Sequence, residues 1–118
     1  MENMSEDLIK FKETHINLGT VRPGSKHVME FKYEGELEVN RNIFGRQDII
    51  TSCGCTSAKH IPQLKIIKVE FTTPDIPVHI QKLGTKTLPT RKSVNVGYKE
   101  TNKIARKLLT FSAVISKE

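Results

Sequence analysis

The stretch MEFKYE, residues 29–34, decides the fold class, because apolar and charged residues alternate in it without interruption. A period of two places Met29, Phe31 and Tyr33 on one face of a β-strand and the charged side chains on the other face. Three more runs alternate in the same way, at residues 67–71, 94–98 and 109–115. Each of these runs predicts a strand that is half buried against a common core.

Weaker strand candidates fill the sequence between these runs. They lie at residues 8–12, 14–18, 38–43, 47–51 and 57–61. Turn-forming residues separate the runs: in Pro23-Gly24, Pro presets φ and Gly accepts a positive φ. Helical periodicity is nearly absent from the sequence. About seven short strands without helices therefore predict an all-β fold, either a sandwich or a small barrel.

The length of 118 residues suits one small domain and leaves no room for two. We therefore expect a single domain over residues 1–118, in which residues 1–13 form an N-terminal arm or a first strand. Residues 75–90 lack a clean pattern and predict a long connection, in which an edge strand could tolerate the prolines. A mechanism based on two hinged domains is excluded.

Hydropathy predicts neither a transmembrane segment nor a signal peptide. No apolar run approaches the roughly 18 residues of a membrane span. Residues 1–7 have neither the basic flank nor the apolar stretch of a secretion signal. We therefore expect a protein that is made in the cytoplasm and does not act at a membrane.

The segment Cys53-Gly54-Cys55-Thr56 is the only compact local motif, and several interpretations compete for it. Zinc would require about four N or S ligands, whereas only His60 lies nearby in sequence. Redox catalysis would require a thiolate stabilised by a helix N-terminus or a basic neighbour. We favour a structural turn in which Gly54 permits an unusual backbone. A Cys53–Cys55 disulfide is geometrically possible, but in a reducing cytoplasm we expect free thiols.

Four segments occur in an order that carries a family resemblance. They are INLGTV at 16–21, PG at 23–24, FKYEG at 31–35 and SCGCT at 52–56. In this order the chain resembles, over roughly residues 14–74, the bacterial and phage family of unknown function marked by a Cys-Gly-Cys-Thr turn. Members of that family are similar to the immunoglobulin-like sandwiches of Hydin and major sperm protein type. The resemblance implies an immunoglobulin-like (Ig-like) antiparallel β-sandwich.

Two features of the chain depart from the common pattern of that family. Pro62-Gln63-Leu64 stands where members commonly have a Pro-Gly turn. Many bacterial members also carry an export signal or lie within larger surface proteins. The form without a signal is similar to the versions carried by tailed phages, which are taken to be virion structural proteins. The resemblance therefore implies a phage particle as the place of action.

Positive charge is concentrated in the second half of the chain. Residues 1–59 hold 8 basic and 9 acidic groups, whereas residues 60–118 hold 11 and 4. We define the basic margin as Lys82, Lys86, Arg91, Lys92, Lys99, Lys103, Arg106 and Lys107. Lysines on exposed strands can simply discourage unwanted pairing; alternatively, the margin binds an acidic partner. Nucleic acid is the weakest candidate partner, because Tyr98 is the only aromatic residue in this stretch and alternation places it in the core.

Motifs for catalysis are missing from the sequence. It has no glycine-rich phosphate loop, no HExxH and no GxSxG, and its four histidines stand alone. We therefore expect no catalytic residues, no metal and no cofactor. The sequence favours a non-enzymatic virion component, either a capsid decoration or a neck or tail accessory, that contacts capsid or tail proteins and could self-associate. The alternative is a host-encoded Ig-like adaptor that binds an acidic protein partner.

Overall fold

The computed structural model of the chain describes residues 9–84, 86–100 and 103–117. This part of the chain contains nine β-strands and a single helical turn, α1 (Val78–Gln81). The strands are β1 (Lys10–Phe11), β2 (His15–Val21), β3 (Lys26–Glu34), β4 (Glu38–Val39), β5 (Ile49–Thr51), β6 (Thr56–Ile61), β7 (Ile66–Thr72), β8 (Thr87–Glu100) and β9 (Lys103–Ser116). All four alternating runs of the sequence are strands, as predicted.

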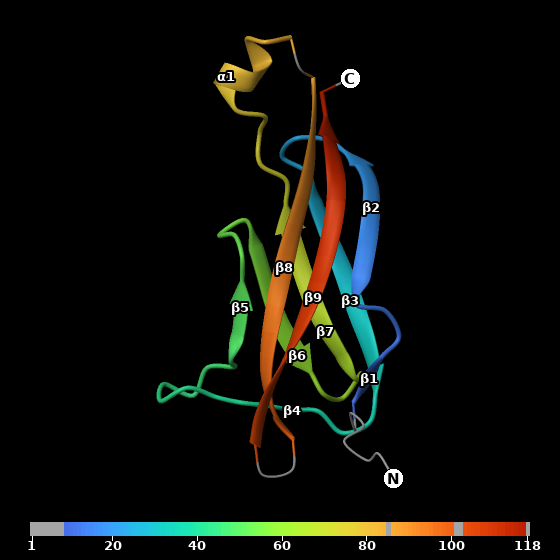
Figure 1. Cartoon of the computed structure of the whole chain (residues 1–118), viewed down its shortest axis with the longest axis vertical. Coiled ribbons are helices and arrows are strands. Elements are labelled where there is room, and N and C mark those ends of the chain that lie inside the picture. The colour runs from blue at the N-terminus through green and yellow to red at the C-terminus, as the bar shows by residue number, and fades with distance from the viewer. Residues whose placement is uncertain (1–8, 85, 101–102, 118) are drawn as a thin grey trace.

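Two sheets pack face to face and form a β-sandwich (Figure 1). One sheet has the order β1-β3-β7-β6, and the other has the order β2-β9-β8-β4, with β5 also paired to β8. These are the two sheets of an immunoglobulin-type sandwich, ABED and CFG, if β4 and β5 together are counted as its third strand. The predicted all-β, Ig-like sandwich is therefore confirmed.

The structure corrects the expected number and direction of the strands. Nine strands replace about seven, because the N-terminal strand is divided between the sheets as β1 and β2, and the third strand is divided into β4 and β5. β8 and β9 are also long, with 14 residues each. β2 pairs with β9 in parallel, so the sandwich is not wholly antiparallel. Alternation along one strand carries no information about the direction of its neighbour.

The connection between β7 and β8 is shorter than predicted and includes the helical turn. Residues 87–90 belong to β8, and no edge strand forms among the described residues before them. Pro77 precedes α1, where its fixed φ suits a helix start. Pro89 lies where β8 is paired with β9 alone, so its missing N–H disrupts no ladder. In the described part of the chain, no helix is long and apolar enough to cross a membrane.

The core lies between the sheets and consists of the alternating apolar residues. Phe31 and Phe71 point inward from one sheet and Phe111 from the other, and all three are fully buried. The rings of Phe71 and Phe111 meet edge to face with centroids 5.1 Å apart, a favourable aromatic geometry. A smaller cluster around Ile76 and Ile115 fills the end of the sandwich near α1. Residues 75–84 are thus anchored to the core through Ile76.

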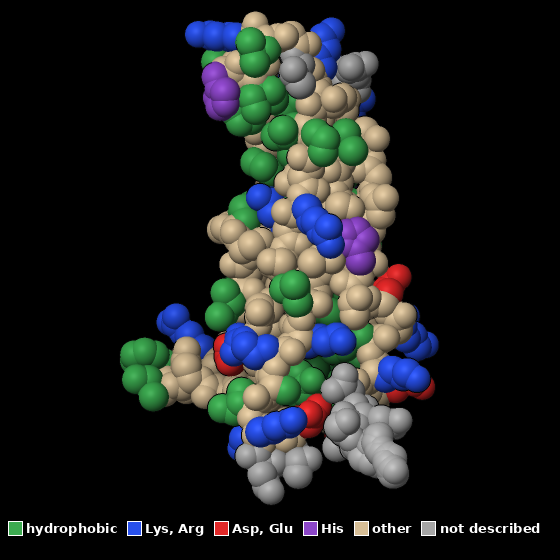
Figure 2. Space-filling view, in the orientation of Figure 1, with side chains coloured by type: hydrophobic (Ala, Val, Ile, Leu, Met, Phe, Trp, Pro, Cys, Tyr) green, Lys and Arg blue, Asp and Glu red, His purple; other side chains and the backbone are tan. Residues whose placement is uncertain are grey.

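A small hairpin between β4 and β5 stands away from the body of the molecule (Figure 1). We call residues 41–47 the finger; Arg41 and Gln47 form an antiparallel bridge across it. Hydrophobic side chains lie at its tip in the space-filling view of Figure 2. The molecule is elongated, with principal extents of 56 × 35 × 23 Å. We call the end where β8 turns into β9 the hairpin end, and the opposite end the α1 end.

Candidate functional site

The eight cations of the basic margin do not gather into one patch. Lys82 lies at the end of α1, and Lys86 directly precedes β8, so both belong to the α1 end. Lys99 and Lys103 lie at the hairpin end. At about 3.3 Å per residue, β8 separates Lys86 from Lys99 by roughly 40 Å. Figure 2 shows the Lys and Arg side chains distributed along the whole length of this face.

The middle of the hairpin carries cations on both of its faces. Arg91 is exposed on the outer face of β8, whereas Lys92, the next residue, points to the opposite face and is half buried. Nearer the hairpin end, Lys107 of β9, which pairs with Val96, is also half buried. A partner that lies against the outer face of the sheet would therefore meet Arg91 but not Lys92.

Carboxylates of the same chain hold three of the cations at the hairpin end. Lys99 lies 3.4 Å from Glu38, and Lys103 lies 3.8 Å from Glu100. Arg106 binds Asp48 through two hydrogen bonds of 2.9 and 3.1 Å. Of these pairs only Lys99–Glu38 is exposed on both sides, and such surface pairs contribute on the order of 0–1 kcal/mol to stability. All three pairs nevertheless reduce the free positive charge at this end.

The Asp48–Arg106 pair fixes the base of the finger to β8. Gly97 lies directly beneath it, and a methyl group at this position would clash with both charged groups. The Gly97 carbonyl accepts from the Asn40 N–H at 2.9 Å, and its N–H donates to the Asp48 carbonyl at 2.8 Å. Both legs of the finger are thus bound to one glycine of β8.

Hydrogen bonds also hold the tip of the finger in one conformation. The Asn42 side-chain oxygen accepts from the backbone N–H of Phe44 at 2.8 Å and of Arg46 at 3.1 Å. The Arg41 guanidinium donates to the Gly45 carbonyl at 2.6 Å, and Gly45 adopts a positive φ of 77°. These bonds present Ile43 and Phe44 to solvent, with exposed fractions of 93% and 78%.

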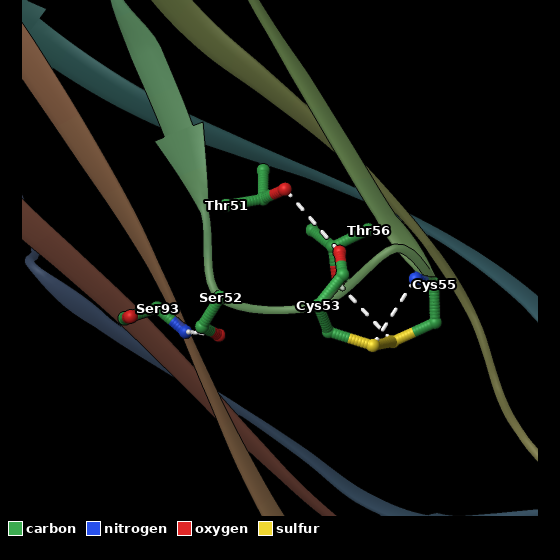
Figure 3. Close-up of a disulfide and its surroundings, with 6 residues drawn as sticks. All are labelled: Thr51, Ser52, Cys53, Cys55, Thr56 and Ser93. Atoms are coloured by element: carbon green, nitrogen blue, oxygen red, sulfur yellow. Dashed lines mark hydrogen bonds between the residues drawn. A yellow bond between two sulfur atoms is a disulfide. The ribbon is translucent and has the colours of Figure 1, made fainter.

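The Cys53–Cys55 turn carries the chain from one sheet to the other, between β5 and β6 (Figure 3). The Ser52 N–H donates to the Ser93 carbonyl at 3.0 Å, and the Ser93 N–H donates to Ser52 Oγ at 2.9 Å. On the other side, the Thr72 N–H donates to the Cys55 carbonyl at 2.9 Å. The turn is therefore bound to β8 in one sheet and to the end of β7 in the other.

The two cysteines form a disulfide, so the expectation of free thiols is wrong. The turn holds their Cα atoms 5.2 Å apart, inside the range that a disulfide requires. The expectation for Gly54 is also wrong: its φ is not positive, and a Cβ at this position would meet no atom within 4 Å. The disulfide and the hydrogen bonds to both sheets determine the shape of the turn. Among the described residues, no three His, Cys, Asp or Glu side chains come together as metal ligands.

His60, the residue considered as a metal ligand beside the turn, is instead part of the core boundary. It is only 8% exposed, and its Nε2 forms a hydrogen bond of 2.6 Å with the Tyr33 hydroxyl. Burial, and secondarily the charge of Arg41, lowers the pKa of His60 below its ordinary value of 6.5. Burial, and secondarily Glu36, raises the pKa of Tyr33. Both shifts favour the neutral forms of the two groups, an uncharged imidazole hydrogen-bonded to an uncharged phenol.

The sequence analysis missed the finger and the buried hydrogen-bonded pair of Tyr33 and His60. The pattern Asn-Ile-Phe-Gly at residues 42–45 is a signal for the finger, because two apolar residues stand between two turn formers. No local signal exists for the pairing of Tyr33 with His60, because the two residues lie on β3 and β6, which flank β7 on either side in one sheet.

Comparisons of this chain with family models, with curated proteins and with solved structures find no match. The resemblance to the family with the Cys-Gly-Cys-Thr turn therefore stays a prediction.

Gly97→Ala should lower the free energy of unfolding by about 1–2 kcal/mol, because the new methyl group displaces the Asp48–Arg106 pair. Urea denaturation measures the change. Gly54→Ala is the matched control and should lie within about 0.5 kcal/mol of the parent chain, since its Cβ meets open space. An equal loss for Gly97→Ala in an Asp48→Ala background would contradict this explanation.

Acidification should destabilise the protein through His60. Since the folded-state pKa is lower than the unfolded value of 6.5, the stability from the neutral imidazole is present above pH 6.5 and is lost as the pH falls through the folded-state pKa. The slope from this group is at most about 1.4 kcal/mol per pH unit. Urea denaturation from pH 7.5 to pH 5 should show a weaker pH dependence in His60→Gln, whereas the exposed His79→Gln control keeps that of the parent. Equal slopes in all three proteins would refute the assignment.

The disulfide should contribute modestly to stability, because it closes a loop of only three residues. The chain-entropy relation gives about 1.5 kcal/mol for such a loop. Cys53→Ser/Cys55→Ser should lose this amount and still unfold cooperatively in urea. Reductant should shift the parent protein to the same stability and leave the double variant unchanged. A titration that detects two free thiols in the denatured, unreduced parent would show that the bond does not form.

Proposed function

We propose that this protein is a non-enzymatic structural protein that acts by surface contact inside a larger assembly. The observation that carries the proposal is the placement of large apolar side chains in water on a well-packed sandwich. Ile43 and Phe44 project from the finger, and Leu83, 81% exposed, lies beside α1 at the opposite end. Adjacent exposed apolar groups, such as Ile43 and Phe44, mark interaction sites more strongly than single ones such as Leu83.

The charge at the hairpin end supports an acidic partner. Arg41, Arg46 and Lys107 form no ion pair with another described residue, whereas the carboxylates of Glu38 and Asp48 are each held by a cation. The free charge on this part of the surface is therefore positive. Contacts of this kind accelerate association and weaken as salt is added.

The more specific proposal is a phage virion component, either a capsid decoration or a neck or tail accessory. It is supported by the resemblance of residues 14–74 to the family with the Cys-Gly-Cys-Thr turn, whose standalone members are taken to be virion proteins. An Ig-like sandwich alone does not determine function, because one fold carries many functions. A host-encoded adaptor for one acidic protein is the competing function.

Fractionation of assembled particles tests the proposal. Density-gradient centrifugation of a lysate in which the particles assemble should place the full chain, followed by antibody, in the particle fraction at 0.1 M salt. At 1 M salt, where charges are screened beyond about 3 Å, at least ten-fold less should remain bound. A chain found only in the soluble fraction, bound to one host protein, would overturn the virion proposal in favour of the adaptor.

Charge reversal identifies the surface that binds. The triple variant Lys99→Glu/Lys103→Glu/Lys107→Glu should reduce particle binding at least ten-fold. The matched control carries the same three changes at exposed lysines on or beside the opposite sheet, Lys12→Glu/Lys32→Glu/Lys59→Glu, and should bind like the parent. Circular dichroism confirms that both variants are folded. Equal binding of the two triple variants would remove the hairpin end from the proposed contact.

A further inference from the structure

The finger carries both components of a docking element, apolar groups at its tip and free charge on its legs. Ile43 and Phe44 are held in water by a turn that Asn42 fixes through two hydrogen bonds. Arg41 and Arg46 flank this tip and form no ion pair with the described residues. Because the turn is already ordered, docking it costs little conformational entropy.

An open pocket lies at the base of the same finger. Its volume is about 570 Å³, within the roughly 300–1,000 Å³ typical of ligand pockets. We call it the corner, since it lies between the finger and the end of the long hairpin. Its lining residues are Glu38, Val39, Asn40, Arg41, Asp48, Lys99 and Ile104.

The corner contains exposed apolar surface and a carboxylate, which complement the apolar tip and the arginines of the finger. Ile104 is 69% exposed there and lies across the strand pair from Lys99. Val39 adds a second, half-buried apolar surface. Glu38 is the more exposed of the two carboxylates in the corner, with its side chain 71% exposed, so a cation from outside could share it with Lys99, which lies 3.4 Å away.

The positions of tip and corner favour a second copy of this chain as the occupant. Tip and corner lie at opposite ends of one short hairpin, because Asn40 and Asp48, which line the corner, are the residues that flank the finger. Two fingers laid side by side in opposite directions would therefore each bring their tip to the corner of the other copy. Such an arrangement has two-fold symmetry and closes after two copies.

We propose that two copies of this protein form a two-fold symmetric dimer by exchanging fingers. Ile43 and Phe44 of each copy pack against Ile104 and Val39 of the other, and Arg46 binds Glu38. This inference does not depend on the proposed function. A monomer could still bind a virion, and a dimer could still be a host adaptor.

Sedimentation velocity on the full chain at 1–100 µM tests the proposal. The parent should convert from monomer to dimer in this range, with no larger species. Ile43→Ser/Phe44→Ser and Ile104→Ser should each weaken dimerisation at least ten-fold. The matched control Val78→Ser/Leu83→Ser, which removes exposed apolar groups at the α1 end, should leave it unchanged. Circular dichroism verifies that each variant is folded.

Mixing the two variants tests the specific contact between finger and corner. A mixed dimer of Ile43→Ser/Phe44→Ser with Ile104→Ser retains one intact finger in one intact corner, whereas each variant alone retains none. The mixture should therefore dimerise more strongly than either variant alone. No gain on mixing would overturn the exchange and indicate contact between two tips.

Other outcomes would also refute the dimer. A parent chain that stays monomeric at 100 µM has no such interface, and an open series of oligomers would replace the closed two-fold contact with a head-to-tail one. The same proteins are sedimented with vesicles of phosphatidylglycerol and phosphatidylcholine (1:3). Binding of a monomeric parent to these vesicles that is lost in Ile43→Ser/Phe44→Ser would make the finger a membrane contact instead.

Discussion

The edge-to-face contact between Phe71 and Phe111 is the point on which the rest of the structure depends, because it joins the two sheets at the centre of the core. Phe71 lies on β7, in the middle of one sheet, and Phe111 lies on β9, in the middle of the other. Side chains alternate along each strand, so fixing these two rings inward also determines which residues of β7 and β9 point outward. The outward-facing polar side chains of the sandwich follow from this register.

The same register determines where functional groups can lie. β8 and β9 pair over 14 residues, which is longer than the core requires, and they carry the basic residues along the whole length of the molecule. The basic margin is therefore divided between the two ends and both faces of the hairpin. The disulfide turn, in contrast, is hydrogen-bonded to both sheets and holds them together where the chain crosses between them.

Gly97 holds the base of the finger to the sandwich, and Gln47 adds two hydrogen bonds to the backbone of His60 on β6. The absence of a side chain at Gly97 lets Asp48 and Arg106 meet over β8, and the Gly97 backbone binds both legs of the finger. Arg41, at the start of the finger, also contributes to the lowered pKa of His60. The hairpin end thus combines an ordered apolar tip, two finger arginines that form no ion pair with the described residues, and a pocket.

The sequence by itself determined the all-β class and the inward faces of the four alternating strands, because a period of two is a local property of each strand. The Ig-like arrangement of these strands was predicted from the resemblance to a known family, not from the alternation. Tertiary structure decided the division into nine strands, the parallel pairing of β2 with β9, the disulfide and the dispersal of the cations. It also decided the pairing of Tyr33 with His60 and of Asp48 with Arg106. These features join residues distant in sequence, or depend on a distance between two side chains, so no pattern along one segment encodes them.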